Sequence, residues 1–329
     1  MFERYILWSR KRESNPRNTA LTYTKMPHSN VQSLREKATK LMSQWIKDYD
    51  GTTSDLYHYC DSEALLGIMS SKELWATDIR HLNDPREFEY GCQLIHELFT
   101  KKSSDYKDAS IEAIRRYTPA QINRFENDSC VYVACFSGHK DMLSQWRSYA
   151  SGGSGYALQL TAPRYLDPVE PVRAGPAIRK VEYCPRMQHK YVEAWVEIMC
   201  ESNYQQIHSN EQSVHHAHFY IENLFWHFIA EATVCFKSEF FVEEKETRLV
   251  WFNPAPSSLH YRSSARGITP YVKFPLCSPH APVDNCIQVT GVRYGPSHNA
   301  RKAESVLNAL KVTHNLPELL ISRSSGALR

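Results

Sequence analysis

The hydrophobic positions of the chain follow two different periods. Short apolar runs at 56–60 (LYHYC) and 131–137 (VYVACFS) are rich in aromatic and β-branched residues, which predicts strands. Residues 62–71 and 87–102 carry apolar side chains at helical spacing, and Asp61 or Ser62 is expected to cap the first of these helices. From residue 56 onward, the chain is therefore expected to mix strands with helices.

The remaining pattern predicts more elements of both kinds. We expect strands at 73–79, 156–160, 179–184, 246–252, 269–274, 286–295 and 318–323. Helices are expected at 31–49, 108–126, 299–314 and 141–150, the last of these with Asp141 as its cap. Residues 187–236 form a long, mostly helical stretch with strands on both sides. This order predicts one α+β domain at 31–329 with a helical insertion at about 187–236.

Composition excludes few classes of protein. The 329 residues are 42% hydrophobic and 12% aromatic, enough for a real core, and the net charge of +3 does not by itself indicate nucleic-acid binding. No apolar run approaches the roughly 18 residues of a membrane span. The nine cysteines, an odd number without a CxxC pair, are expected to be free thiols. We therefore expect a cytoplasmic protein without a membrane partner.

Residues 1–30 are set apart from the fold. The basic segment RKRESNPRNTAL resembles the translated antisense strand of a transfer-RNA gene. We expect either a disordered basic arm or residues that precede the true translation start, with Met26 or a later codon as that start.

Two strand-associated segments carry candidate chemistry. His58 faces away from Tyr57 and Tyr59, because side chains alternate along a strand; it is either a core histidine or a ring N–H donor to a ribose or phosphate. Asn83 and Glu87 flank the Asp-Pro turn that starts the next helix. Capping explains Asp84 well but explains Glu87 poorly.

The segment 136–149 joins a strand to an amphipathic helix. Ser137 lies at the carboxyl end of the strand, where ligands often bind. Trp146 and Tyr149 are spaced i, i+3, which fits plain core packing as well as a ligand site.

The sharpest feature is the alternation of Glu244, Glu246 and Arg248 within FVEEKETRLVW. A strand places all three on one face, either as exposed charges at a sheet edge or as a central cluster in which Arg248 partners the carboxylates. No HExxH or Cys/His ligand series accompanies the histidines near 215–227, so no metal site is expected.

Together these motifs resemble a bacterial domain-of-unknown-function family, number 2971. Its members share LYHYT, LNDPxE, CFSxxxDxLxxW and ExExR, and the resemblance spans about residues 56–325. Cys60 stands where the family usually has threonine, and Thr247 where an aromatic residue is common.

The same layout is similar to the ADP-ribosyltransferase superfamily. The resemblance implies a split mixed β-sheet with flanking helices, in which a histidine holds one ribose of NAD, an aromatic ring packs on nicotinamide and a late-strand glutamate grips the other ribose. Position by position, these become His58, then Trp75 or Tyr149, and then Glu246 or Glu244.

The resemblance implies an NAD-consuming enzyme that cleaves the nicotinamide glycosidic bond, as a toxin or phage-defence effector. Nicotinamide is already a cationic leaving group, so one carboxylate that stabilises an oxocarbenium-like transition state suffices. The expected catalytic residues are Glu246, Glu244 and His58. The expected NAD-binding residues are His58, Tyr59, Trp75, Asn83, Glu87, Ser137, Trp146, Tyr149 and Arg248. The acceptor of ADP-ribose, a protein, a nucleic acid or water, stays open.

Two alternatives remain open. Glu243 and Lys245 on a strand, with Asp84 upstream, faintly resemble a metal-dependent nuclease. A catalytically inert sensor that binds a nucleotide and signals through the helical insertion is the other.

Overall fold

The computed structural model describes residues 36–37, 40–41, 55–82, 85–104, 131–161, 175–200, 228–264, 267–277 and 287–326. The segment 1–30 and the helix expected at 108–126 lie outside these ranges. The division of the chain at residue 30 therefore stays a prediction.

Strands and helices alternate through the described chain. The strands are β1 (Leu56–Cys60), β2 (Glu73–Asp78), β3 (Val131–Ser137), β4 (Tyr156–Thr161), β5 (Gly175–Lys180), β6 (Glu246–Phe252), β7 (Leu259–Ser264), β8 (Gly267–Cys277), β9 (Ile287–Tyr294) and β10 (Leu320–Arg323). The helices are α3 (Ser62–Ser71), α4 (Pro85–Ser104), α6 (Leu143–Tyr149), α7 (Pro185–Cys200) and α10 (Ala300–Thr313), with short 3₁₀ turns that include η3 (Glu239–Glu244). The predicted α+β class is confirmed.

Six of the strands close into a barrel. Pairing runs β1-β4-β9-β8-β2-β3 and returns from β3 to β1, while β6 and β5 extend the sheet beyond β3. The sheet is mixed, because β9 pairs in parallel with β8 and β10 whereas the other ladders are antiparallel. A closed barrel removes most of the free strand edges that would otherwise pair with other chains.

Strand β3 is where the barrel closes. One edge of β3 pairs with β6 along its full length, from Val131 to Ser137. The other edge pairs with β2 at Tyr132 and Val133 and with β1 at Ser137. The residues between them have no ladder partner on that edge among the described strands, so the pairing of β3 passes from one strand to another there.

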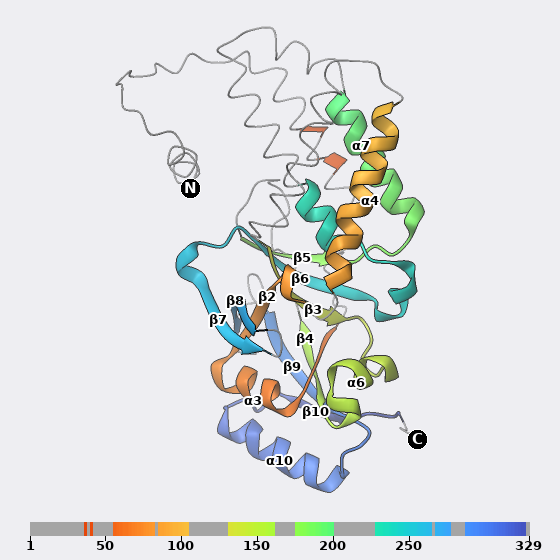
Figure 1. The fold of residues 1–329 in the computed structure, drawn as a ribbon. Helices are drawn as coiled ribbons and strands as arrows, with labels where there is room; N and C mark the ends of the chain where they lie inside the picture. Colours follow the sequence, from red (N-terminus) through yellow and green to blue (C-terminus); the bar gives the residue numbers. More distant parts are fainter. Residues whose placement is uncertain are drawn as a thin grey trace, which may run out of the picture.

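Two hydrophobic cores lie on the two faces of this sheet. Alternate residues of β3, such as Tyr132 and Phe136, fill the barrel with Leu74, Leu158 and Tyr294. The intervening residues of β3 and β6 pack against α4, α7 and helical residues 228–235. Figure 1 shows these helices gathered at the β5–β6 side and α3 and α10 at the opposite end of the barrel.

Most of the predicted elements are present, with three differences. Asp61 caps α3, as expected, by accepting from the Ala64 N–H at 2.8 Å. Asp141 does not cap α6, because that helix begins at Leu143 after Met142. The strand expected at 179–184 instead ends at Lys180, and β7 was not predicted.

The helical stretch expected at 187–236 is helical at both ends, in α7 and in residues 228–235. Five cysteines are free, as expected: Cys60, Cys92, Cys135, Cys184 and Cys235. Cys277 is disulfide-bonded, so the expectation of free thiols is wrong for that residue.

Candidate functional site

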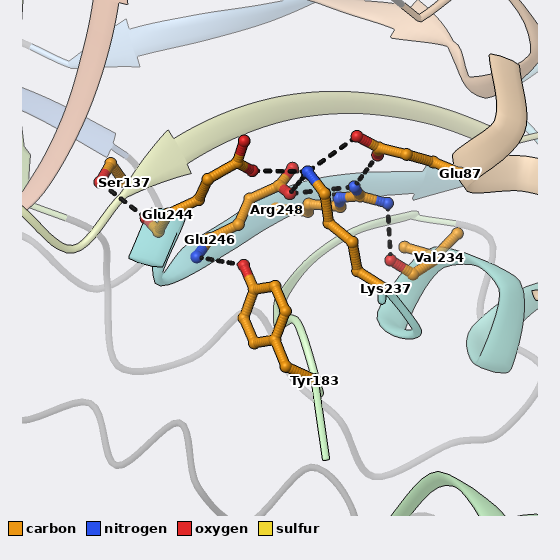
Figure 2. Close-up of polar contacts among 8 residues, drawn as sticks. All are labelled: Glu87, Ser137, Tyr183, Val234, Lys237, Glu244, Glu246 and Arg248. Atoms are coloured by element: carbon orange, nitrogen blue, oxygen red, sulfur yellow. Dashed lines mark hydrogen bonds and ion pairs between the residues drawn. The ribbon is translucent and has the colours of Figure 1, made fainter. Parts of the chain in front are cut away.

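Five charged side chains meet on the helix-covered face of the sheet (Figure 2). Glu87 comes from the first turn of α4, Lys237 follows helical residues 228–235, and Glu244 ends η3. Glu246 and Arg248 are alternate residues of β6. Three carboxylates surround two cations, so the cluster carries one net negative charge when every group is ionised.

Lys237 is the centre of the cluster. Its Nζ lies 2.7 Å from Glu87 Oε1, 2.5 Å from Glu244 Oε2 and 3.0 Å from Glu246 Oε2. Burial alone would lower the pKa of Lys237, but the charges of Glu246 and Glu87 outweigh burial and raise it. Lys237 is therefore a buried, permanent cation that three elements of the fold share.

Arg248 is fully buried beside Lys237. Its Nε and one terminal nitrogen donate to the two oxygens of Glu246 at 2.7 and 3.0 Å. It also donates to Glu87 Oε2 at 2.6 Å and to the Val234 carbonyl at 2.9 Å. The guanidinium is thus engaged within the protein, and its role is to hold the two carboxylates in place.

Glu246 is buried and saturated with partners. Arg248 and Lys237 occupy both of its oxygens, and the Cys135 thiol adds a further hydrogen bond. Burial would raise the pKa of Glu246, but the two cations lower it to about 2. Its backbone N–H donates to the Tyr183 hydroxyl at 2.9 Å. Glu246 is therefore ionised at neutral pH and holds the two cations.

Glu244 differs from the other two carboxylates. One oxygen binds Lys237, while the other accepts no hydrogen bond from the described residues, and the side chain is 17% exposed. Burial raises the pKa of Glu244 despite the opposing charge of Lys237. Of the three carboxylates, Glu244 therefore has the oxygen best placed to meet a ligand.

Tyr149 adds an aromatic ring to this side of the cluster. It is the last residue of α6 and is 37% exposed. Burial and then the charge of Glu244 raise the pKa of its hydroxyl, on which Lys237 and Glu246 also act. The hydroxyl is therefore neutral at physiological pH and close to the carboxylates.

Local hydrogen bonds fix the turn that presents Glu244. The Ser137 hydroxyl donates to the Glu244 carbonyl at 2.8 Å and accepts from the His139 N–H at 3.1 Å. Lys245 then adopts a left-handed conformation with φ of 41°, which lets β6 begin directly after η3. Ser137 is buried, so its hydroxyl positions the turn rather than facing solvent.

His58 lies in the gap where the pairing of β3 passes from β2 to β1. Its Nδ1 lies 3.0 Å from the Cys135 carbonyl, and its ring meets Phe136 edge-on at 5.9 Å between ring centroids. Since a carbonyl only accepts, Nδ1 carries the proton, and Nε2 of the neutral ring is an acceptor. Burial lowers the pKa of His58, which favours this neutral form.

Cys135 stands between His58 and the charged cluster. Its carbonyl bonds His58 in the plane of the sheet, while its side chain contacts Glu246 on the helix-covered face. By the alternation of β1, the His58 side chain shares the barrel-side face with Leu56 and Cys60. The structure therefore separates His58 and Glu246 by the width of strand β3.

Three of the remaining candidate residues take part in packing away from the cluster. Tyr59 and Trp146 are buried against each other, with ring centroids 4.9 Å apart, and the Tyr59 hydroxyl donates to the His139 carbonyl. Trp75 is on the outer face of β2, stacked on Tyr271. Asn83 lies outside the described residues.

The expected alternation of Glu244, Glu246 and Arg248 on one strand is wrong for Glu244. β6 begins at Glu246, whereas Glu244 and Glu243 belong to η3 and Lys245 follows as its cap. The strand-borne Glu243 and Lys245 expected for a nuclease are therefore also not on a strand. Within the described ranges, no group of three or more His, Cys, Asp or Glu side chains is arranged to hold a metal ion.

Sequence reasoning missed Lys237. It directly follows the apolar run ATVCF at the end of a helix. A lysine that continues such a buried run is expected to be buried with it. A buried lysine requires carboxylate partners, so this position next to the acidic segment was a usable signal.

None of the helices in the described part of the chain combines the length and apolar character needed to cross a bilayer. Comparisons with curated proteins and with solved structures found no match. Residues 145–249 match the model of the family described as a protein of unknown function (DUF2971). The match includes Tyr149, Lys237, Glu244, Glu246 and Arg248, and thus most of the charged cluster. Over these residues the chain is similar to this family, in line with the resemblance of its sequence motifs.

Proposed function

We propose that the chain is an NAD-consuming enzyme that cleaves the nicotinamide glycosidic bond and transfers ADP-ribose to water or to a macromolecule. The proposal includes an ADP-ribosyltransferase-like use of the sheet, with NAD bound near the place where β1 and β2 share an edge of β3. The observation that carries it is the free oxygen of Glu244 at the exposed margin of a cluster with net negative charge.

Cleavage of the nicotinamide glycosidic bond requires a carboxylate of this kind. Loss of nicotinamide leaves an oxocarbenium-like ribose, which a carboxylate stabilises by its charge and by a hydrogen bond to a ribose hydroxyl. Glu244 is the reacting carboxylate in this proposal. Glu246 and Glu87 fix Lys237 and Arg248 and thereby hold Glu244 in position. The Tyr149 ring is the surface on which nicotinamide packs.

His58 is proposed to act from the other side of β3. With Nδ1 engaged by the Cys135 carbonyl, Nε2 remains available to accept a ribose hydroxyl proton. In this proposal His58 has a fixed ring orientation and binds a ribose on the barrel side of β3, away from the face that carries Glu244.

The test is nicotinamide release from NAD by the full chain and two matched variants. We expect Glu244→Gln to lower the rate by at least about a hundredfold, the usual cost of removing one stabiliser of transition-state charge. Glu243→Gln, at the exposed neighbouring position, leaves the rate unchanged. Equal rates for wild type and Glu244→Gln, or no release in the presence of NAD and cell lysate, would reject the proposal.

A further inference from the structure

A row of rings crosses three neighbouring strands on the outer face of the barrel, away from the charged cluster. Trp75 of β2 stacks on Tyr271 of β8 with ring centroids 4.5 Å apart and an interplanar angle of 29°. Tyr271 in turn lies 5.5 Å from His260 of β7 at 31°. These three residues share one face because His260 and Tyr271 are paired and because Trp75 and Tyr271 are outward-facing residues of adjacent strands.

Two cations accompany the rings. The Arg262 guanidinium lies 5.7 Å from the Trp75 ring centroid and 5.9 Å from that of Tyr271, held by a 3.0 Å hydrogen bond to Thr77 Oγ1. Lys273, paired with Trp75 in the ladder, makes a partly exposed ion pair with Glu73 at 2.9 Å. Two cations and one carboxylate leave the surface with a net positive charge.

The two outer rings of this row remain open to a ligand, whereas Tyr271 between them is only 7% exposed and supports them from within the sheet. Trp75 is 40% exposed, an unusual position for a tryptophan on an outer sheet face, and all of β7 except Leu259 is exposed. The rings are carried by strands that are paired with one another, because β8 forms ladders with both β2 and β7. A flat ring surface with a guanidinium plane is suited to stack planar, electron-rich rings.

We propose that this surface, formed by Trp75, His260, Arg262 and Lys273 over the buried Tyr271 ring, binds single-stranded nucleic acid. Bases stack on Trp75 and on the Arg262 plane, and the two cations meet the phosphates. Nucleic acid is favoured over an isolated base because the two exposed rings, Trp75 of β2 and His260 of β7, lie about 10 Å apart on either side of the buried Tyr271. The inference does not depend on NAD consumption, since the residues are separate from the charged cluster.

The experiment is fluorescence anisotropy of a labelled 12-nucleotide single strand, as DNA and as RNA, with the full chain at several salt concentrations. Trp75→Ala is expected to weaken binding about tenfold, the loss of one stacked base. Trp75→Phe retains most of the affinity and shows that the ring, rather than the fold, is responsible. Arg262→Gln reduces the slope of log affinity against log salt by about one.

Tyr261→Ala is the matched control. Tyr261 is 63% exposed on the same strand as Arg262, but it points to the opposite face of β7. Its removal is expected to leave the affinity unchanged.

Four outcomes would overturn the proposal. These are no binding of either strand at low salt, equal affinity for the corresponding duplex, equal losses in Trp75→Ala and Tyr261→Ala, and displacement of the strand by equimolar NAD. The last would assign the rings to the adenine of a dinucleotide. Failure of NAD cleavage alone leaves this binding experiment unaffected.

Discussion

Glu87 Oε2 lies 2.6 Å from an Arg248 guanidinium nitrogen, although 161 residues separate the two in the chain. The other oxygen of Glu87 binds Lys237 at 2.7 Å. This one carboxylate, on the first turn of α4, thus binds both buried cations: Arg248 of β6 and Lys237 of the segment before it. The helix is held to the sheet by charge as well as by its apolar face.

The first prediction concerns this link. Glu87→Gln should lower the free energy of unfolding by about 3 kcal/mol, because both cations lose a carboxylate in a nearly dry environment. Urea denaturation measures the effect. Glu89→Gln, an exposed position on the same helix, should change stability by less than about 0.5 kcal/mol. Equal effects of the two substitutions would show that the Glu87 contacts contribute little.

The second prediction concerns the pH dependence of Glu246. Its pKa of about 2 is below the ordinary value near 4.3, so its ionisation stabilises the folded state. That stability is complete above about pH 5 and is lost as pH falls toward 2, by about 3 kcal/mol in total. Unfolding free energies between pH 7 and 3 should therefore fall less steeply for Glu246→Gln than for the wild type.

Glu244→Gln is the control of opposite sign. The pKa of Glu244 is raised, so the folded state binds its proton more tightly and loses stability as pH rises through the titration of Glu244. The Glu244→Gln variant should then gain stability with pH more steeply than the wild type just above pH 4.5. Identical slopes for the two variants would contradict the assignment of the two carboxylates.

The third prediction concerns His58. Its pKa is lowered in the folded state, so the unfolded chain takes up the proton first and stability falls as pH drops below about 6.5. His58→Asn retains an N–H donor for the Cys135 carbonyl but does not titrate. The stability advantage of the wild type over the variant should be greatest at pH 8 and should shrink by pH 5. A difference that stays constant over this range would argue against a buried neutral imidazole.

The fourth prediction concerns a second buried ion pair, in which Arg179 of β5 donates twice to Glu231 at 2.7 Å. Glu231→Gln should cost about 3–5 kcal/mol, because it leaves Arg179 charged in the core. The double variant Arg179→Met with Glu231→Leu should recover most of that loss, since no unpaired charge remains. Thermal unfolding of the single and double variants measures this, and fully additive losses would exclude the explanation.

Local structure followed closely from the sequence. The apolar runs of β1, β3 and β6 and the helical spacing of α3 and α10 predicted these elements, because backbone periodicity depends on neighbouring residues alone. The turn residues also predicted the Asp61 cap. The motifs around Tyr149 and Arg248 indicated the resemblance to the family from the same local information.

The composition of the charged cluster depended on the tertiary structure. Sequence alternation brought Glu246 and Arg248 together, but Lys237 and Glu87 reach them only because a helix end and the start of α4 pack on the same face of the sheet. The different states of Glu244 and Glu246 likewise come from burial and from the number of cations around each. Partner choice across long sequence separations is decided by packing, which no local pattern encodes. The sequence by itself therefore determined most of the helices and strands and the resemblance to the family over residues 145–249, whereas the tertiary structure decided which carboxylate is free to meet a ligand.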